Sequence, residues 1–247
     1  MGYSGIRDLL WAAAVIPPVL LMIYIYRQDK IEKEPPGLLF RLFCGGALSV
    51  LSAIVLESVG MAVGKLLFGE RTVAYTVFTC FLVVGGAEEG GKFFFLRRIT
   101  WRNPEFNYRF DAIVYAVFVS MGFALVENIT YVLGDGTVAT ALLRGTTAIP
   151  GHAAFAVFMG YYYGMAKLYE DYAWRCGDGS LAARYRYLSQ RYLRSAVIVP
   201  ALIHGFYDFC LEMQLAVTSW IFVGFIVLLD LVALRRIRKI QRSDSMV

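Results

Sequence analysis

The sequence predicts an all-α membrane protein, a polytopic bundle of about seven transmembrane helices. Its composition is the first observation behind this prediction. Of the 247 residues 58% are hydrophobic and only 17% are charged, against about 25% charged in soluble proteins. The mean hydropathy is +0.57. A soluble core of this size cannot hide so much apolar side chain, so the lipid bilayer is the solvent that fits.

The second observation is the length of the apolar segments, several of which reach the roughly 20 residues needed to cross a bilayer. The first segment is followed by Arg27 and polar residues instead of a small-residue cleavage site, so we interpret it as a retained span. The predicted spans are 9–26, 43–66, 72–95, 111–133, 145–167, 196–213 and 215–234. No further domain is predicted, and we expect residues 1–247 to form one membrane-embedded domain.

The third observation is where the basic residues lie. Most of the 24 Lys and Arg residues fall in the connecting segments 27–41, 97–110 and 167–195 and in the tail after residue 234. With seven spans, these four segments share one side of the membrane. The positive-inside rule then predicts an N-terminus outside and a C-terminus in the cytoplasm. The net charge of +5 therefore indicates orientation in a membrane and not binding to nucleic acid.

Ionisable residues inside the predicted spans are the functional candidates, because a charge at bilayer depth costs at least about 2.5–3.5 kcal/mol. The two histidines of the chain, His152 and His204, both lie in apolar spans. Together with carboxylates on other spans, they favour a metal or proton site over ordinary packing roles. Glu57 and Asp230 are interpreted as structural, with Glu57 paired to Lys65. The remaining candidates are Glu88, Glu89, Lys92, Glu127 and Asp208.

The adjacent Glu88 and Glu89 repel each other, and Lys92 is placed to offset that repulsion. Lys92 follows Glu88 by four residues and Glu89 by three, so it can reach either on one helix face. One glutamate can then be ion-paired while the other stays free for chemistry. Asp111, which opens the fourth span, is expected to cap the N-terminus of that helix.

Spacing also links His204 to Asp208, which lie four residues apart on one helix face. Asp208 can orient the imidazole or bind a metal itself. Two imidazoles and one or two carboxylates from four spans can hold a catalytic zinc, which keeps one position open for water. In ideal helices, Glu127 and His152 would lie about 10 Å further out than Glu88 and His204. A shared site therefore requires either different span boundaries or displaced or broken helices around a water-filled cavity.

Four motifs, in order along the chain, resemble those of the PrsW family of intramembrane proteases. The segments 26–36 and 111–115 agree as well, so the resemblance covers nearly the whole sequence. The matching residues are Glu88, Glu89 and Lys92 for EExxK, Phe123 and Glu127 for FxxxE, His152 for a single conserved histidine, and His204 and Asp208 for HxxxD. The family is related to the CAAX-prenyl endopeptidases and to the Aph-type subunit of gamma-secretase.

The resemblance implies a multi-pass endopeptidase of the bacterial cytoplasmic membrane. Its expected partners are the bilayer and a single-span, membrane-anchored protein such as an anti-sigma factor, cut in a site-1 reaction. Zinc is the expected cofactor. His152, His204 and Glu127 are expected to bind the metal, with Asp208 behind His204. Glu88 is expected to act as general base, with Glu89 and Lys92 completing the catalytic set.

Two other functions fit parts of the pattern. Carboxylate and histidine relays also serve ion- or proton-coupled transporters, although the inverted repeats common in transporters are not visible in this sequence. A non-catalytic scaffold that binds membrane helices is the other alternative. The complete set of four motifs argues against it.

Overall fold

The computed structural model describes residues 3–135 and 137–247, including the side chains of residues 8–134 and 137–247. The described residues are almost entirely helical, with one isolated antiparallel bridge between Tyr108 and Met246. The predicted all-α class is confirmed. The predicted position of the N-terminus concerns Met1 and Gly2, which lie outside the described residues.

Each predicted span falls on one helix or one continuous helical run. Two π-helical stretches, η1 and η2, interrupt the runs that contain the third and fifth predicted spans. In chain order the elements are α1 (Tyr3–Gln28), α2 (Pro36–Phe68), α3 (Val73–Val77), η1 (Phe78–Val84), α4 (Gly85–Thr100), α5 (Asp111–Asp135), α6 (Val138–Leu143), η2 (Arg144–Ala148), α7 (Ile149–Arg175), α8 (Gly179–Glu212) and α9 (Ala216–Arg242).

Within residues 3–135 and 137–247, five helices are long and apolar enough to cross a membrane, namely α1, α2, α5, α8 and α9. The chain is therefore a polytopic helical membrane protein. The other two predicted spans correspond to the run α3–η1–α4 and to η2–α7. Neither run contains a helix that is both long enough and apolar enough to count as a candidate span. The helix α4 has only 16 residues and carries two glutamates and a lysine in its first half, and α7 is rich in glycine and tyrosine.

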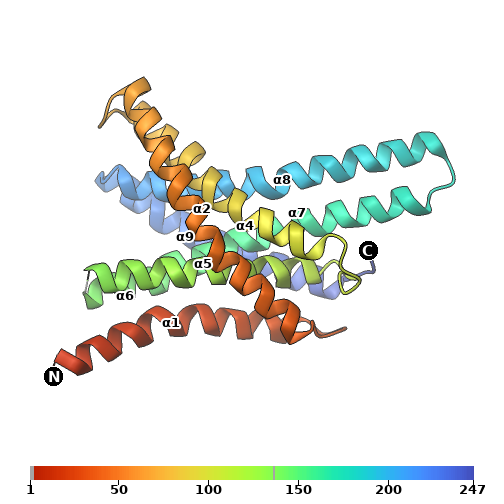
Figure 1. The fold of residues 1–247 in the computed structure, drawn as a ribbon, viewed down its shortest axis with the longest axis horizontal. Helices are drawn as coiled ribbons and strands as arrows, with labels where there is room; N and C mark the ends of the chain where they lie inside the picture. Colours follow the sequence, from red (N-terminus) through yellow and green to blue (C-terminus); the bar gives the residue numbers. More distant parts are fainter. Residues whose placement is uncertain (1–2, 136) are drawn as a thin grey trace.

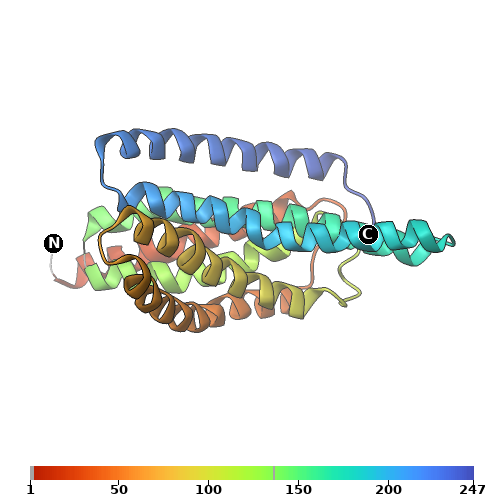
Figure 2. The same ribbon diagram turned by 90° about the horizontal axis from the view of Figure 1, so that it is seen from above.

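The connecting segment 167–195 is helical along most of its length, which the sequence analysis did not predict. The helix α7 continues to Arg175, and α8 begins at Gly179, where Asp178 accepts hydrogen bonds from the main-chain N–H groups of Ser180 and Leu181. This antiparallel pair projects beyond the rest of the bundle (Figures 1 and 2). Low hydropathy does not distinguish a polar helical hairpin from a loop, which is why the sequence pattern failed here.

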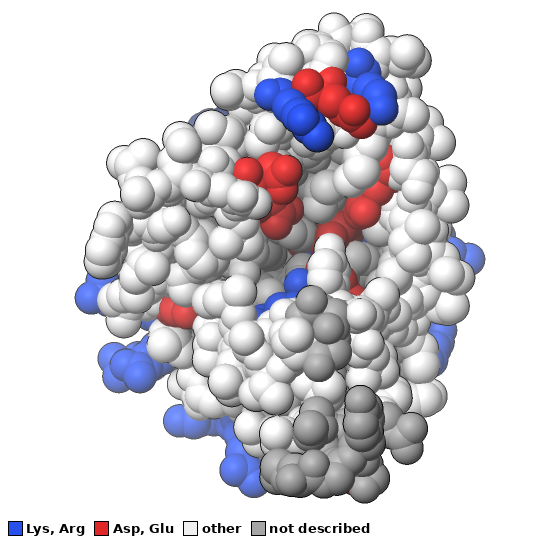
Figure 3. All heavy atoms as spheres, turned by 90° about the vertical axis from the view of Figure 1, so that its left-hand side faces the viewer, with Lys and Arg blue, Asp and Glu red and all other residues white. Residues whose placement is uncertain are grey.

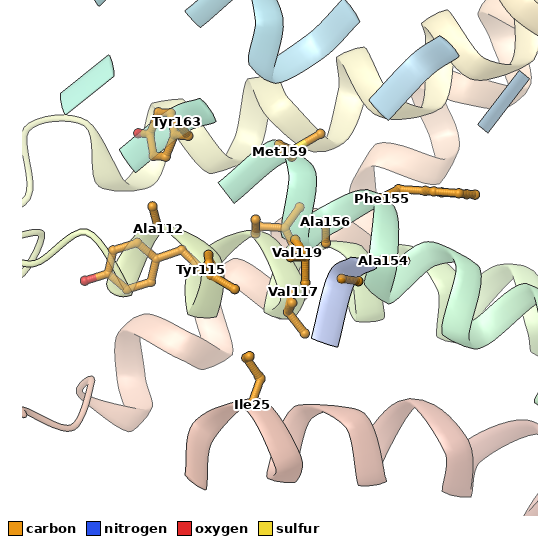
Figure 4. Close-up of a cluster of buried hydrophobic side chains, with 14 of the residues drawn as sticks. Ile25, Ala112, Tyr115, Val117, Val119, Ala154, Phe155, Ala156, Met159 and Tyr163 are labelled. Atoms are coloured by element: carbon orange, nitrogen blue, oxygen red, sulfur yellow. The ribbon is translucent and has the colours of Figure 1, made fainter. Parts of the chain in front are cut away.

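The helix α5 lies at the centre of the bundle and contacts α1, α2 and α7. Its apolar window is 72% buried, a larger share than in the other four candidate spans. Figure 4 shows side chains of α5 meeting those of α7, with Ile25 of α1 below them. Because α5 is enclosed on several sides, polar residues on it are held in fixed positions.

Two glycines allow α2 to cross α5 at very short range. A Cβ atom on Gly46 of α2 would lie 1.8 Å from the carbonyl oxygen of Val119, and one on Gly122 of α5 would lie 2.0 Å from the carbonyl oxygen of Phe43. Only hydrogen atoms fit at this crossing. The oblique path of α2 over α5 is visible in Figure 1. This close contact holds α5, the helix that carries Glu127, in place against α2.

Candidate active site

A cavity of about 500 Å³ opens at the end of the bundle where α2 meets α3 and where α8 meets α9. Figure 3 faces this end and shows acidic side chains inside a hollow. We call this space the acidic cavity. Its polar lining includes Glu57, Glu88, Glu127, Arg144, His152, His204 and Asp208, contributed by α2, α4, α5, η2, α7 and α8.

The first two turns of α4, up to Lys92, bring three charged side chains together. The Lys92 ammonium nitrogen lies 2.7 Å from Glu89 Oε1 and 3.0 Å from Glu88 Oε2. Lys92 and Glu89 are both 0% exposed and do not line the acidic cavity, whereas Glu88 does. The two adjacent glutamates therefore differ in their surroundings, and only Glu88 faces the space that a substrate could enter.

His204 on α8 is held between carboxylates on both sides of its ring. Its Nδ1 atom lies 3.0 Å from Glu89 Oε1, and its Nε2 atom lies 3.4 Å from Asp208 Oδ2. Phe155 stacks on the imidazole with ring centroids 4.8 Å apart. A buried carboxylate on one ring nitrogen fixes the orientation of the ring, and here Glu89 occupies that place.

His152 on α7 is held in a comparable way. Lys92 Nζ lies 3.2 Å from its Nδ1 atom, and Glu127 Oε2 lies 2.8 Å from its Nε2 atom. The hydroxyl of Ser120 donates a hydrogen bond of 2.9 Å to the His152 carbonyl oxygen, which ties α5 to α7 at this level. The two imidazole rings are nearly perpendicular, with centroids 5.3 Å apart.

The two π-helical stretches lie directly before α4 and α7, two of the four helices that carry candidate residues. The stretch η1 precedes Glu88 and Glu89, and η2 precedes His152. A π-turn accommodates one extra residue and is frequent at functional sites. Ideal helices would have separated the candidates by about 10 Å, and the structure instead brings side chains of all four helices to one cavity.

The donor atoms gathered here can hold a metal ion. One oxygen or nitrogen atom from each of Glu88, Glu89, His152 and His204 lies within 4.8 Å of the other three, and all four residues are buried. Glu127 and Asp208 contact the Nε2 atoms of the two imidazoles. Among the described residues, Asp208 Oδ2 is buried and accepts no hydrogen bond. Imidazole and carboxylate groups are suitable zinc ligands.

The sequence pattern misplaced Glu57 and overlooked Arg144. Lys65 pairs with Glu70 at 2.7 Å, so the expected Glu57–Lys65 pair is wrong, and Glu57 lines the acidic cavity. Arg144 lies 3.2 Å from Glu127 Oε2. The sequence contained one signal that could have identified Arg144 as a site residue. It lies at the outer edge of a predicted span, in a connection with few basic residues. Asp230 borders a separate apolar pocket away from this site.

Comparison with known proteins finds the same family over most of the chain. The family described as PrsW family intramembrane metalloprotease matches residues 34–234. Curated relatives named Protease PrsW include that of Geobacillus kaustophilus, 34% identical over 93% of this chain and 91% of the relative. Those of Oceanobacillus iheyensis and Bacillus subtilis are 32% and 31% identical, over 92% and 95% of this chain and 94% and 97% of their own lengths. No solved structure matches.

Proposed function

The chain belongs to the PrsW family of intramembrane metalloproteases, and from this premise we propose that residues 1–247 act as one protease domain of the bacterial cytoplasmic membrane. Its substrate in this proposal is a single-span, membrane-anchored protein such as an anti-sigma factor, cut in a site-1 reaction. The observation that carries the proposal is the acidic cavity, in which the candidate side chains of α4, α5, α7 and α8 meet.

The proposed metal is zinc, with the Nε2 atoms of His152 and His204 as ligands. Glu127 and Asp208 lie 2.8 and 3.4 Å from these nitrogens. Both carboxylates are close enough to share an ion with an imidazole, because two ligands of one tetrahedral zinc, each about 2.0–2.1 Å from the ion, are roughly 3.4 Å apart. In this proposal Glu127 is the third ligand, and Asp208 lies beside His204. Zinc bound here supplies a Lewis acid for the scissile carbonyl and lowers the pKa of a bound water.

Glu88 is the proposed general base because it is the member of the glutamate pair that faces the cavity. Its carboxylate takes a proton from the attacking water and passes it to the nitrogen of the leaving peptide. Glu89 has a different role in this proposal. It holds His204 at Nδ1 and neutralises Lys92, whose ammonium nitrogen lies 3.2 Å from His152 Nδ1.

We further propose seven spans, with the N-terminus outside and the C-terminus in the cytoplasm. In this orientation the basic α7–α8 hairpin lies in the cytoplasm, and the acidic cavity opens at the opposite, outer end of the bundle. The cut would then fall near the outer end of the substrate's span. Arg144, paired with Glu127 at 3.2 Å, borders the cavity where a substrate enters.

The test is cleavage of a tagged single-span reporter, co-expressed with the wild type or with Glu88→Gln. Glu170→Gln, on the projecting hairpin outside the cavity, is the matched control. We expect the wild type and the control to release the outer fragment and Glu88→Gln to release at least about 100-fold less. Cleavage by Glu88→Gln at the wild-type rate would overturn the assignment of the base.

A further inference from the structure

A second group of buried carboxylates lies at the other end of α5. It consists of Asp29 and Glu34 from the α1–α2 connection and Asp111 at the start of α5, and each residue is at most 2% exposed. One carboxylate oxygen of each lies within 4.8 Å of the other two. Asp111 precedes Glu127 by 16 residues on the same helix, which at 1.5 Å per residue places it roughly 24 Å from the acidic cavity.

The contacts of Asp111 are not those of the expected helix cap. Its Oδ2 atom accepts hydrogen bonds from the main-chain N–H groups of Asn107 and Tyr108, at 3.1 and 2.7 Å. Both donors precede α5 and belong to the α4–α5 connection. Tyr115 donates to Glu34 Oε2 at 2.5 Å. The three carboxylates therefore join two connections that are far apart in the sequence.

No ion pair among the described residues neutralises this group. None of their Lys, Arg or His side chains forms an ion pair with Asp29, Glu34 or Asp111. Lys33 instead donates to the main-chain oxygens of Tyr26 and Asp29. The helix N-termini of α2 and α5 offset part of the charge, at about half a unit each.

Asp29 provides a separate observation that points to a ligand. Its Oδ2 atom is buried and has no hydrogen-bond partner among the described residues. An unpaired buried oxygen is uncommon and costly.

We propose that Asp29, Glu34 and Asp111 bind one hard divalent cation, Mg²⁺ or Ca²⁺. All the donors are oxygen atoms, which these ions prefer. The three donor oxygen atoms lie within 4.8 Å of one another, and opposite ligands of such ions are about 4–5 Å apart. The absence of nitrogen and sulfur donors separates this site from the proposed zinc site.

The cation would fasten the non-catalytic end of the bundle. It would join the α1–α2 connection to the start of α5, where the C-terminal tail also attaches. In that tail Asp244 accepts from Phe110 N, and Val247 N donates to the carbonyl of Asn107. This proposal also gives a role to the segments 26–36 and 111–115, which contain the three carboxylates. Both segments resemble the PrsW family but take no part in the acidic cavity.

The experiment measures Mn²⁺ binding by electron paramagnetic resonance, with Mn²⁺ as a probe for hard divalent ions. Purified full-length protein in detergent is first given one equivalent of Zn²⁺, so that zinc occupies the imidazole-containing site. We expect the wild type to bind one Mn²⁺ per chain. We expect Asp29→Asn and Glu34→Gln to bind it at least about tenfold more weakly, and Asp171→Asn, in a surface pair with Arg175, to bind like the wild type.

Competition by Mg²⁺ and by Ca²⁺ identifies which ion fits better, and loss of Mn²⁺ to either supports the site. Thermal unfolding gives a second readout that does not depend on the probe. Divalent ions should raise the melting temperature of the wild type and of Asp171→Asn but not of Asp29→Asn. The proposal is wrong if the wild type binds no Mn²⁺, if Asp29→Asn binds it equally well, or if Asp29→Asn melts higher than the wild type with divalent ions present.

Discussion

Neutralising the two adjacent glutamates one at a time should damage the protein in different ways. Both substitutions, Glu88→Gln and Glu89→Gln, keep the shape of the side chain and remove one charge. Glu89 contacts Lys92 at 2.7 Å and His204 at 3.0 Å inside a fully buried cluster. Glu88 makes a longer contact with Lys92, at 3.0 Å, and faces the acidic cavity.

The expected magnitudes follow from these contacts. Removing one partner of a buried ion pair costs about 3–5 kcal/mol. Glu89→Gln leaves Lys92 with Glu88 as a remaining counter-ion, so we expect a loss near the lower end, about 3 kcal/mol of unfolding free energy. Glu88→Gln keeps the shorter Lys92–Glu89 pair, so we expect only about 1 kcal/mol. Loss of a general base should slow cleavage by about 10²–10⁴-fold.

The assay measures unfolding in detergent and reporter cleavage on the same purified variants. Glu88→Gln should be nearly as stable as the wild type and inactive, and Glu89→Gln should be clearly less stable. If Glu88→Gln is the less stable variant, or if it cleaves while Glu89→Gln is stable and inactive, the roles of the two glutamates are reversed and the reasoning fails.

Three further predictions concern the metal, the helix crossing and the orientation. His152→Ala and His204→Ala should lose most of the bound metal, whereas Glu88→Gln should retain it. The metal content is measured by elemental mass spectrometry, and equal metal in all three variants would reject the imidazoles as ligands. Gly122→Ala should lower the unfolding free energy by about 1–3 kcal/mol, because its Cβ would meet the Phe43 carbonyl at 2.0 Å. Gly134→Ala on the same helix, with nothing within 4 Å, should not. Cys176, a free cysteine in the α7–α8 turn, should react with an impermeant thiol reagent in inside-out vesicles and not in intact cells, and labelling in intact cells would reverse the proposed orientation.

Composition was enough to predict the helical membrane class, because the bilayer requires long apolar segments that are easy to recognise. The candidate residues could be found because they are polar exceptions within these apolar segments. Two histidines and several carboxylates stand out there because charges inside a membrane are costly. The polar hairpin over 167–195 was missed because neither hydropathy nor charge separates a solvated helix from a loop.

Contacts between distant segments could not be predicted from spacing. The pairing of Lys65 with Glu70 in place of Glu57 depends on the turn after α2. The pairing of Arg144 with Glu127 depends on how α6 and η2 fold back toward α5. The same holds for the cluster of Asp29, Glu34 and Asp111, whose members come from two connections and are brought together only by the packed bundle.

The position of the π-helical stretches sets a limit on how the chain length can vary. A π-turn already takes up one extra residue, and each further residue of a helix turns the chain by about 100°. An insertion within Phe78–Val84 would therefore rotate Glu88 and Glu89 against the helix that precedes them, and an insertion within Arg144–Ala148 would rotate His152. Insertions should be tolerated in the turn between α2 and α3 and excluded from η1 and η2, although all three segments are short and lie near the same end of the bundle.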